Sequence, residues 1–230
     1  MAHIKTVGTA ILLSAVAMAH ARAADAAHPI VVEIFQSQGC SSCPPANANV
    51  LALSNRPEIL TLSFGVTYWD YLGWKDTFAS PQFTQRQKDY APALHHWGVF
   101  TPQVVVNGRA DVVGQNRAEL EALIARQKPD MAAPEVRIAQ GTVTIGSGKG
   151  EAQVWLVRYD PRIVQVSIDR GENSGITLPH KNIVKQLLLL GAWSGKVQSY
   201  ALPSAQQPGL RNAVLLQQGK GGPILAAARG

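Results

Sequence analysis

The chain contains only two cysteines, Cys40 and Cys43, and two serines separate them. The pair stands between an apolar, β-branched run at residues 29–35 and a segment at residues 43–54 whose apolar residues have helical spacing. A thiol at a helix start is favoured as the thiolate, because free N–H groups and the helix dipole stabilise negative charge there. The thiolate attacks in thiol–disulfide exchange, and a nearby second thiol resolves the mixed disulfide. The spacing therefore predicts exchange, with a solvent-accessible Cys40 attacking and Cys43 resolving.

Three other uses of the two thiols stay open. An inert structural disulfide would close a loop so short that it adds only about 2 kcal/mol of stability. Zinc needs two further ligands, and the adjacent His95 and His96 would diverge on a helix. Two thiolates and one histidine suit Cu(I), so a copper-handling binding module is the metal alternative. Exchange through a redox-active disulfide, which needs no cofactor or metal, is the use that we favour.

Thr101 and Pro102 stand immediately before a second β-branched run, in the segment WGVFTPQVVVNG. Proline is tolerated at the start of a strand because no ladder donor is lost there. A cis bond between the two residues would make a tight turn and leave the Thr101 backbone free to pair with an incoming chain. An ordinary trans proline at a strand edge is the alternative. We predict a cis Thr101-Pro102 bond beside the cysteines.

The N-terminal segment has the three features of a secretory signal peptide. Lys5 supplies a positive charge, residues 7–19 form a short apolar stretch, and Ala21-Arg22-Ala23 is a small-x-small cleavage site. The apolar stretch is too short to cross a bilayer, so we expect no stable membrane insertion. Residues 1–23 are therefore predicted to be removed, leaving a periplasmic or secreted protein.

The mature chain is only mildly basic. Without Lys5 and Arg22, 19 basic and 15 acidic residues leave a net charge of +4. This charge is small and evenly spread, which argues against a nucleic-acid partner. The expected partners are the thiols or disulfides of exported proteins and a separate redox partner.

The pattern of elements changes near residue 130. Before it, expected strands and helices alternate, with Ser80 and Asn116 as candidate N-caps: 29–35, 43–54, 58–69, 80–94, 102–108, 110–114 and 116–127. After it come seven short strand candidates: EVRIA, GTVTIG, AQVWLVRY, IVQVSI, VQSYAL, NAVLLQQ and PILAAA. This second pattern favours a mostly antiparallel β-sandwich, with the domain boundary in KPDMAAPE.

The segment YWDYLGWKD combines four aromatic residues with Asp70 and Asp76. The two carboxylates are candidates for a place near the thiols. The simpler interpretation is that Trp69 and Trp74 anchor a core or domain interface and that Asp76 caps a helix.

A second polar segment, RGENSGITLPHKNIV, lies far along the chain. Asn173 and Gly175 indicate a turn. His180 and Asn182 would alternate on one face of a strand. A lone histidine is usually a structural hydrogen-bonding residue, but His180 is a candidate polar contact to the Cys40 site.

Residues 29–128 resemble a thioredoxin-like domain in their order of elements around C-x-x-C and T-P. The mature chain is similar more closely to the DUF1223 family of exported thioredoxin-like proteins. The segments that carry this similarity are VEIFQSQGCSSCPPA, YWDYLGWKDTFASPQFTQRQ, TPQVVVNG and RGENSGITLPHKNIV. The resemblance implies a thioredoxin-like α/β domain at 29–130, with a mixed central sheet flanked by helices, and a β-sandwich at 131–230. It also implies Cys40 as nucleophile, Cys43 as resolver and Pro102 as the cis-proline that faces them.

This chain departs from both patterns. Thioredoxins have Trp before the first cysteine, Gly-Pro within the pair and a buried acid six residues earlier; here these are Gly39, Ser41-Ser42 and Ile34. The resemblance therefore does not imply their proton relay or their strongly reducing behaviour. The closer family leads us to expect His and Asp at positions that hold Gly65 and Thr67 in this chain.

Overall fold

The computed structural model describes residues 24–127, 132–205 and 207–230. The predicted signal peptide at 1–23 lies outside the described residues, and so do residues 128–131 of the predicted boundary segment KPDMAAPE (128–135). Both therefore stay predictions. Within the described ranges, no helix is long and apolar enough to cross a membrane.

The first half of the chain alternates strands and helices as expected. Its elements are β1 (Ile30–Gln36), α1 (Cys43–Leu53), β2 (Ile59–Gly65), the 3₁₀ helix η1 (Asp70–Leu72), α2 (Pro81–Ala93), β3 (Gln103–Val106), β4 (Ala110–Val112) and α3 (Arg117–Arg126). Strands β1 and β2 are parallel, β3 is antiparallel to β1, and β4 is antiparallel to β3.

The second half is built from strands. They are β5 (Val136–Ala139), β6 (Thr142–Ile145), β7 (Ala152–Asp160), β8 (Val164–Ser167), β9 (Thr177–His180), β10 (Ile183–Trp193), β11 (Gln198–Ala201), β12 (Arg211–Gln217) and β13 (Ile224–Arg229). All seven predicted segments form strands, because their β-branched runs are bounded by turn residues.

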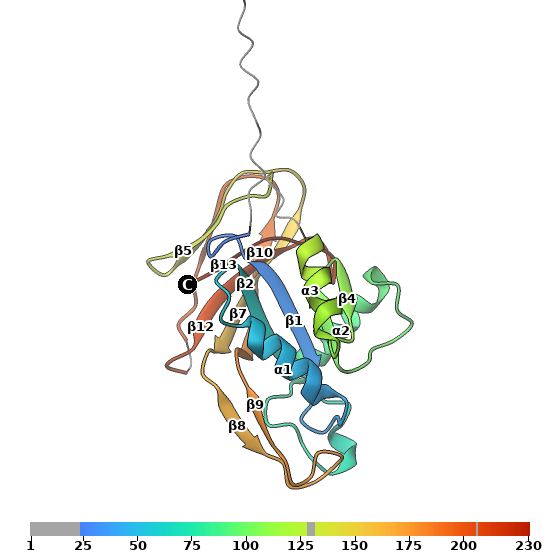
Figure 1. Ribbon diagram of the computed structural model, residues 1–230. Coiled ribbons are helices and arrows are strands. Elements are labelled where there is room, and N and C mark those ends of the chain that lie inside the picture. The colour runs from blue at the N-terminus through green and yellow to red at the C-terminus, as the bar shows by residue number, and fades with distance from the viewer. Residues whose placement is uncertain (1–23, 128–131, 206) are drawn as a thin grey trace, which may run out of the picture.

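The pairing of these strands differs from the expected self-contained sandwich. Four of them join the strands of the first half in one sheet, in the order β13-β12-β7-β10-β2-β1-β3-β4. Strands β5, β6 and β11 form a separate three-stranded sheet, and β8 pairs with β9. The protein thus has a mixed α/β fold with a large central sheet and few helices (Figure 1).

The two halves of the sheet meet between β2 and β10. Ile183 pairs with Ser63, and the Ser63 backbone N–H donates to the carbonyl oxygen of Asn182 over 2.9 Å. A second junction lies at the turn after β3, where the Asn107 carbonyl accepts from the N–H of Ile224 over 2.8 Å. Gly108, with φ +61°, follows directly, and a Cβ there would come within 2.5 Å of a backbone oxygen. A side chain at this position would separate the two halves.

Helices cover both faces of the sheet. Alternate residues of β1 point to opposite faces, as strand geometry requires. Ile30, Val32 and Ile34 pack with α1 and α3, whereas Val31 and Phe35 pack with α2. Figure 1 shows α1 lying along β1 and β2. The core on the α2 side also includes residues of β7, β10 and β12, so one core spans both halves.

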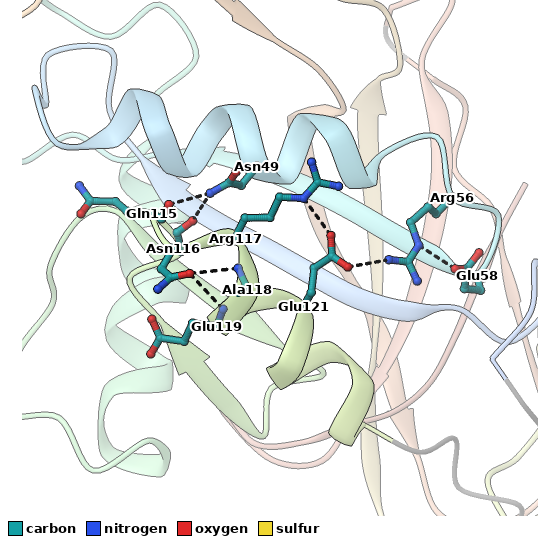
Figure 2. A network of polar contacts seen from close by, with 10 residues as sticks. Asn49, Arg56, Glu58, Gln115, Asn116, Arg117, Ala118, Glu119 and Glu121 are labelled. Carbon is teal, nitrogen blue, oxygen red and sulfur yellow. Dashed lines mark hydrogen bonds and ion pairs between the residues drawn. The ribbon is translucent and has the colours of Figure 1, made fainter.

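The predicted N-caps of α2 and α3 are confirmed. The Ser80 hydroxyl accepts from the N–H of Gln82, and the Asn116 side chain accepts from two backbone N–H groups, as Figure 2 shows. Beside this cap, the Asn49 amide of α1 donates to the carbonyl oxygens of Gly114 and Gln115, both over 2.9 Å. These contacts fix α1, and the cysteine segment before it, against the loop that leads into α3.

Candidate functional site

The two cysteines form a disulfide, with Cα atoms 5.5 Å apart. Helix α1 begins at Cys43 with Ser42 at its N-cap, so Cys40 lies before the helix rather than at its start. This corrects the sequence-based expectation: residues 41 and 42 form a turn, closed by the Cys43 N–H donating to the Cys40 carbonyl over 3.1 Å. Pro44 and Pro45 fall in the first helical turn, where proline is tolerated.

Both cysteines are buried in this disulfide form. Cys40 and Cys43 are each only 1% exposed, while Ser41 and Ser42 between them are exposed. The expected accessibility of Cys40 concerned the reduced protein and stays a prediction. In the oxidised protein, neighbouring groups cover the sulfur that a client would have to reach.

Thr101 is one of these neighbours. The Thr101-Pro102 bond is cis, as predicted, and Pro102 is buried. The Thr101 hydroxyl donates to Cys40 Sγ over 3.2 Å. Ser42 Oγ lies 3.2 Å from the same sulfur and 3.4 Å from the Thr101 carbonyl oxygen, so its single proton can go to either. Three of the four predicted site residues thus meet at or beside Cys40 Sγ.

The indole of Trp69 completes this side of the site. Its Nε1 donates to Thr101 Oγ1 over 2.6 Å. Trp69 also lies beside Gly39, since a Cβ on that glycine would come within 3.8 Å of Trp69 Cβ. Trp69 is therefore part of the site as well as the aromatic anchor that the sequence indicates.

Asp76 does not cap a helix, which corrects the simpler sequence interpretation. It is 4% exposed, and its two carboxylate oxygens accept from the N–H groups of Gln38 and Phe78, both over 2.7 Å. Burial raises the pKa of this carboxyl to about 6. Trp74, also in this segment, donates through Nε1 to Gln38 Oε1 over 2.9 Å. The segment that leads to Cys40 is thus fastened at Gln38.

The turn between β8 and β9 supplies the contacts that the sequence did not reveal. Asn173 is 5% exposed and donates through Nδ2 to the carbonyl oxygens of Gln38 and Cys40, over 2.8 and 2.9 Å. The Glu172 carboxylate accepts from the Ser41 N–H over 2.9 Å, which lowers the pKa of Glu172. In Figure 1 the β8–β9 hairpin projects from the end of the sheet at which α1 begins. The sequence indicated a turn at Asn173 and Gly175, but no local pattern showed that this turn contacts the cysteine segment.

His180 is buried, yet Glu172 and Asn173, not His180, make the described contacts to the cysteine segment. Its ring meets Phe78 edge-on with centroids 5.5 Å apart, and its Nε2 has no hydrogen-bond partner among the described residues. Burial lowers the pKa of His180 to about 4. Asn182 lies after the end of β9, with φ 51°, so it does not share a strand face with His180 as expected.

Three of the positions at which this chain departs from the expected family patterns have local roles. Ile34 packs in the core under α1, and Thr67 Oγ1 lies 3.0 Å from the hydroxyl of Thr84 in α2. Gly65 pairs with Ala79, and a Cβ on it would come within 2.8 Å of that residue's backbone nitrogen. A histidine at position 65 would force this pairing apart.

His95 and His96 both lie after the end of α2 at Ala93, so they are not on a helix as the sequence-based argument assumed. His95 takes a left-handed conformation with φ 61°, whereas His96 Nε2 lies 2.8 Å from Asp111 Oδ2. Across residues 24–127, 132–205 and 207–230, no group of three or more His, Cys, Asp or Glu side chains is arranged to hold a metal ion.

Two solved structures are similar to this chain. The crystal structure of protein AGR_C_4864 from Agrobacterium tumefaciens is 31% identical, with a TM-score of 0.73 over 87% of this chain and 92% of that one. HBP35 of Porphyromonas gingivalis is 16% identical, with a TM-score of 0.53 over 88% of this chain and 74% of that one, and shows a similarity of fold alone.

The chain has no match among curated proteins. One family model covers residues 31–217, which include the cysteine pair, the Thr101-Pro102 segment and the β8–β9 turn. The chain therefore belongs to the family DUF1223, whose description is "Protein of unknown function".

Proposed function

We propose that this protein is an exported thiol–disulfide oxidoreductase that acts on protein thiols through Cys40 and Cys43. The observation that carries the proposal is the asymmetry between the two sulfurs. Two hydroxyl groups, those of Thr101 and Ser42, lie 3.2 Å from Cys40 Sγ. Within the described part of the chain, no hydrogen bond to Cys43 Sγ is found. Hydroxyl donors stabilise a thiolate more than a neutral sulfur, so they favour Cys40 as the sulfur that exchanges.

The reaction is a two-electron exchange. A client thiolate attacks Cys40 Sγ, the bond to Cys43 breaks, and Cys43 leaves as a thiolate that takes up a proton. A second client thiolate then attacks the client sulfur of the mixed disulfide and releases Cys40. The client dithiol has lost two protons and two electrons, and the cysteine pair has gained them. The reverse sequence reduces a client disulfide, with Cys40 attacking and Cys43 resolving.

We also propose that residues 29–130 are a thioredoxin-like unit. The order of its elements, with β1 parallel to β2 and with β3 and β4 antiparallel, supports this assignment. Residues 131–230 then form a second, β-rich part that contributes the β8–β9 turn to the site. Export depends on the predicted signal peptide at residues 1–23.

The function is tested by trapping. In a Cys43→Ser variant, attack by Cys40 on a client disulfide gives a mixed disulfide that has no second thiol to resolve it. Expressed with its leader, this variant should collect client proteins as covalent adducts that disappear on treatment with reductant. The measurement is non-reducing gel electrophoresis of the exported fraction, followed by mass spectrometry.

The matched control is Cys40→Ser, which also has one thiol and also lacks the disulfide. It should trap few clients, because the attacking sulfur is missing. Equal adduct yields from the two variants, or none from either, would contradict the proposal. If instead both variants lose Cu(I) binding alike, the two thiolates serve as metal ligands.

A further inference from the structure

Trp69 hydrogen-bonds to Thr101 Oγ1 as a donor, and it cannot accept a proton in return. An indole N–H is a donor only, and it reaches Thr101 Oγ1 over 2.6 Å. The threonine oxygen therefore accepts from Trp69, and its own single proton is left to point elsewhere. Cys40 Sγ, 3.2 Å away, is in position to accept it.

We propose that Trp69 is a positioning residue for the exchange reaction, and that it acts on the Cys40 sulfur through the Thr101 hydroxyl. This inference rests on the proposed function. By occupying a lone pair of Thr101 Oγ1, Trp69 orients the hydroxyl proton toward Cys40 and polarises it. A thiolate accepts such a hydrogen bond more strongly than a disulfide sulfur does. The pair therefore stabilises reduced Cys40 relative to the disulfide.

Packing holds the indole in the orientation that this role requires. The ring of Trp69 stacks on Tyr71, with an interplanar angle of 14° and centroids 6.5 Å apart, and it is tilted against Tyr68 at 6.3 Å. A Cβ on Gly39 would come within 3.8 Å of the Cβ and the carbonyl oxygen of Trp69. Because Gly39 directly precedes Cys40, Trp69 is in contact with the cysteine segment both through packing and through Thr101.

Tyr68 is the competing acceptor for the Thr101 proton. An interaction with the Thr101 side chain lowers the pKa of Tyr68 against the larger effect of burial. The Tyr68 hydroxyl donates to Gln87 Oε1 over 3.1 Å, which leaves a lone pair available. Burial raises the pKa of Tyr68 to about 12, so the phenol stays neutral at physiological pH. Two variants should therefore change the hydrogen bond from Thr101 to Cys40 in opposite directions. Losing Trp69 weakens this hydrogen bond, and Tyr68→Phe strengthens it by removing the competing acceptor.

The test measures two properties of the full-length mature protein. One is the pH midpoint for alkylation of Cys40 in the reduced protein, and the other is the equilibrium constant of the cysteine pair with glutathione. Trp69→Phe, which keeps an aromatic ring, should raise the midpoint and shift the equilibrium toward the disulfide by roughly two- to tenfold, the range of one hydrogen bond. Tyr68→Phe should shift both quantities in the opposite direction.

A double-mutant cycle separates this role from a purely structural one. Thr101→Val should reproduce the Trp69→Phe shift, Thr101→Ser should keep wild-type values, and the Trp69→Phe/Thr101→Val double variant should shift no further than Thr101→Val alone. Additive shifts, or an unchanged midpoint in Trp69→Phe, would overturn the inference. Client trapping by Cys43→Ser is read separately: trapping without a Trp69 effect removes only this inference, and a Trp69 effect without trapping removes only the proposed function.

Discussion

Two of the buried polar groups in the described part of the chain differ in how fully their charges and hydrogen-bonding atoms are paired. In the first, Arg86 of α2 donates to both carboxylate oxygens of Glu33 in β1, over 2.7 and 3.1 Å. Arg86 also donates to Gln217 and to the Tyr90 hydroxyl, and Tyr90 hydrogen-bonds to Glu33. In the second, beside the cysteine segment, Asp76 accepts from two backbone N–H groups, and His180 Nε2 has no hydrogen-bond partner among the described residues.

The difference separates a structural group from one that responds to pH. Burial disfavours the charge on Arg86, but Glu33 outweighs it and raises the pKa of Arg86 above its ordinary value. Arg86 therefore keeps its positive charge beside Glu33. Asp76 accepts from the Phe78 N–H and His180 packs edge-on against the Phe78 ring. Burial raises the pKa of Asp76 to about 6 and lowers the pKa of His180 to about 4. The second group therefore couples proton binding to the region of the disulfide.

The largest effect is expected from breaking the first group. Arg86→Met leaves the Glu33 carboxylate buried without its partner, and removing one member of a buried ion pair costs about 3–5 kcal/mol of unfolding free energy. Urea denaturation of the mature protein measures this. The double variant Glu33→Gln/Arg86→Met should recover much of the loss. A single variant as stable as wild type would show that the ion pair is not the main bond between β1 and α2.

The second effect concerns His180 and has a defined pH window. Because its folded pKa is depressed, the unfolded chain binds a proton between pH 6.5 and about 4 that the native protein does not. This contribution to stability is full above pH 6.5 and is lost as pH falls through about 4. Relative to His180→Asn, wild type should therefore lose about 3 kcal/mol of stability between pH 7 and pH 4, measured by denaturation at each pH. A pH-independent difference would contradict the assignment.

The elements that local residue chemistry fixes could be predicted from the sequence. Ser80 and Asn116 cap their helices because a side-chain oxygen two or three residues before a free N–H needs no distant partner. The strands of the second half follow from β-branched runs between turns. Predicting the cis Thr101-Pro102 bond also required the observation that a C-x-x-C segment lies upstream in the sequence.

Contacts between distant segments could not be predicted in this way. The pairing of β2 with β10 joins Ser63 to residue 183, and no local pattern selects one apolar strand over another as a partner. The same holds for Asn173, whose amide binds carbonyl oxygens 133 and 135 residues earlier in the chain. Its sequence context indicates only a turn. Asp76 was misassigned to a helix cap because its real donor, the N–H of Gln38, lies 38 residues away.

The smallest of these effects, and the one closest to the disulfide, is expected at Asp76. Its folded pKa is raised, so the native protein binds a proton between pH 3.8 and about 6 that the unfolded chain has already released. The resulting stability is present below pH 3.8 and is lost as pH rises through about 6. Compared with Asp76→Asn, wild type should lose about 2 to 3 kcal/mol between pH 4 and pH 7, opposite in sign to the His180 effect.

Asp76→Asn is a demanding control because its amide keeps an acceptor for only one of the two N–H groups that Asp76 binds. That loss is constant with pH, so it cancels from the slope of the stability difference. His180 is unchanged in both proteins and cancels as well. The nearby charges of Asp70 and Lys185 act on Asp76 in opposite directions and are common to both. A stability difference that stayed flat from pH 4 to pH 7 would show that Asp76 is not protonated in this range. His180 would then be the one pH-responsive residue left to contrast with the ion pair of Glu33 and Arg86.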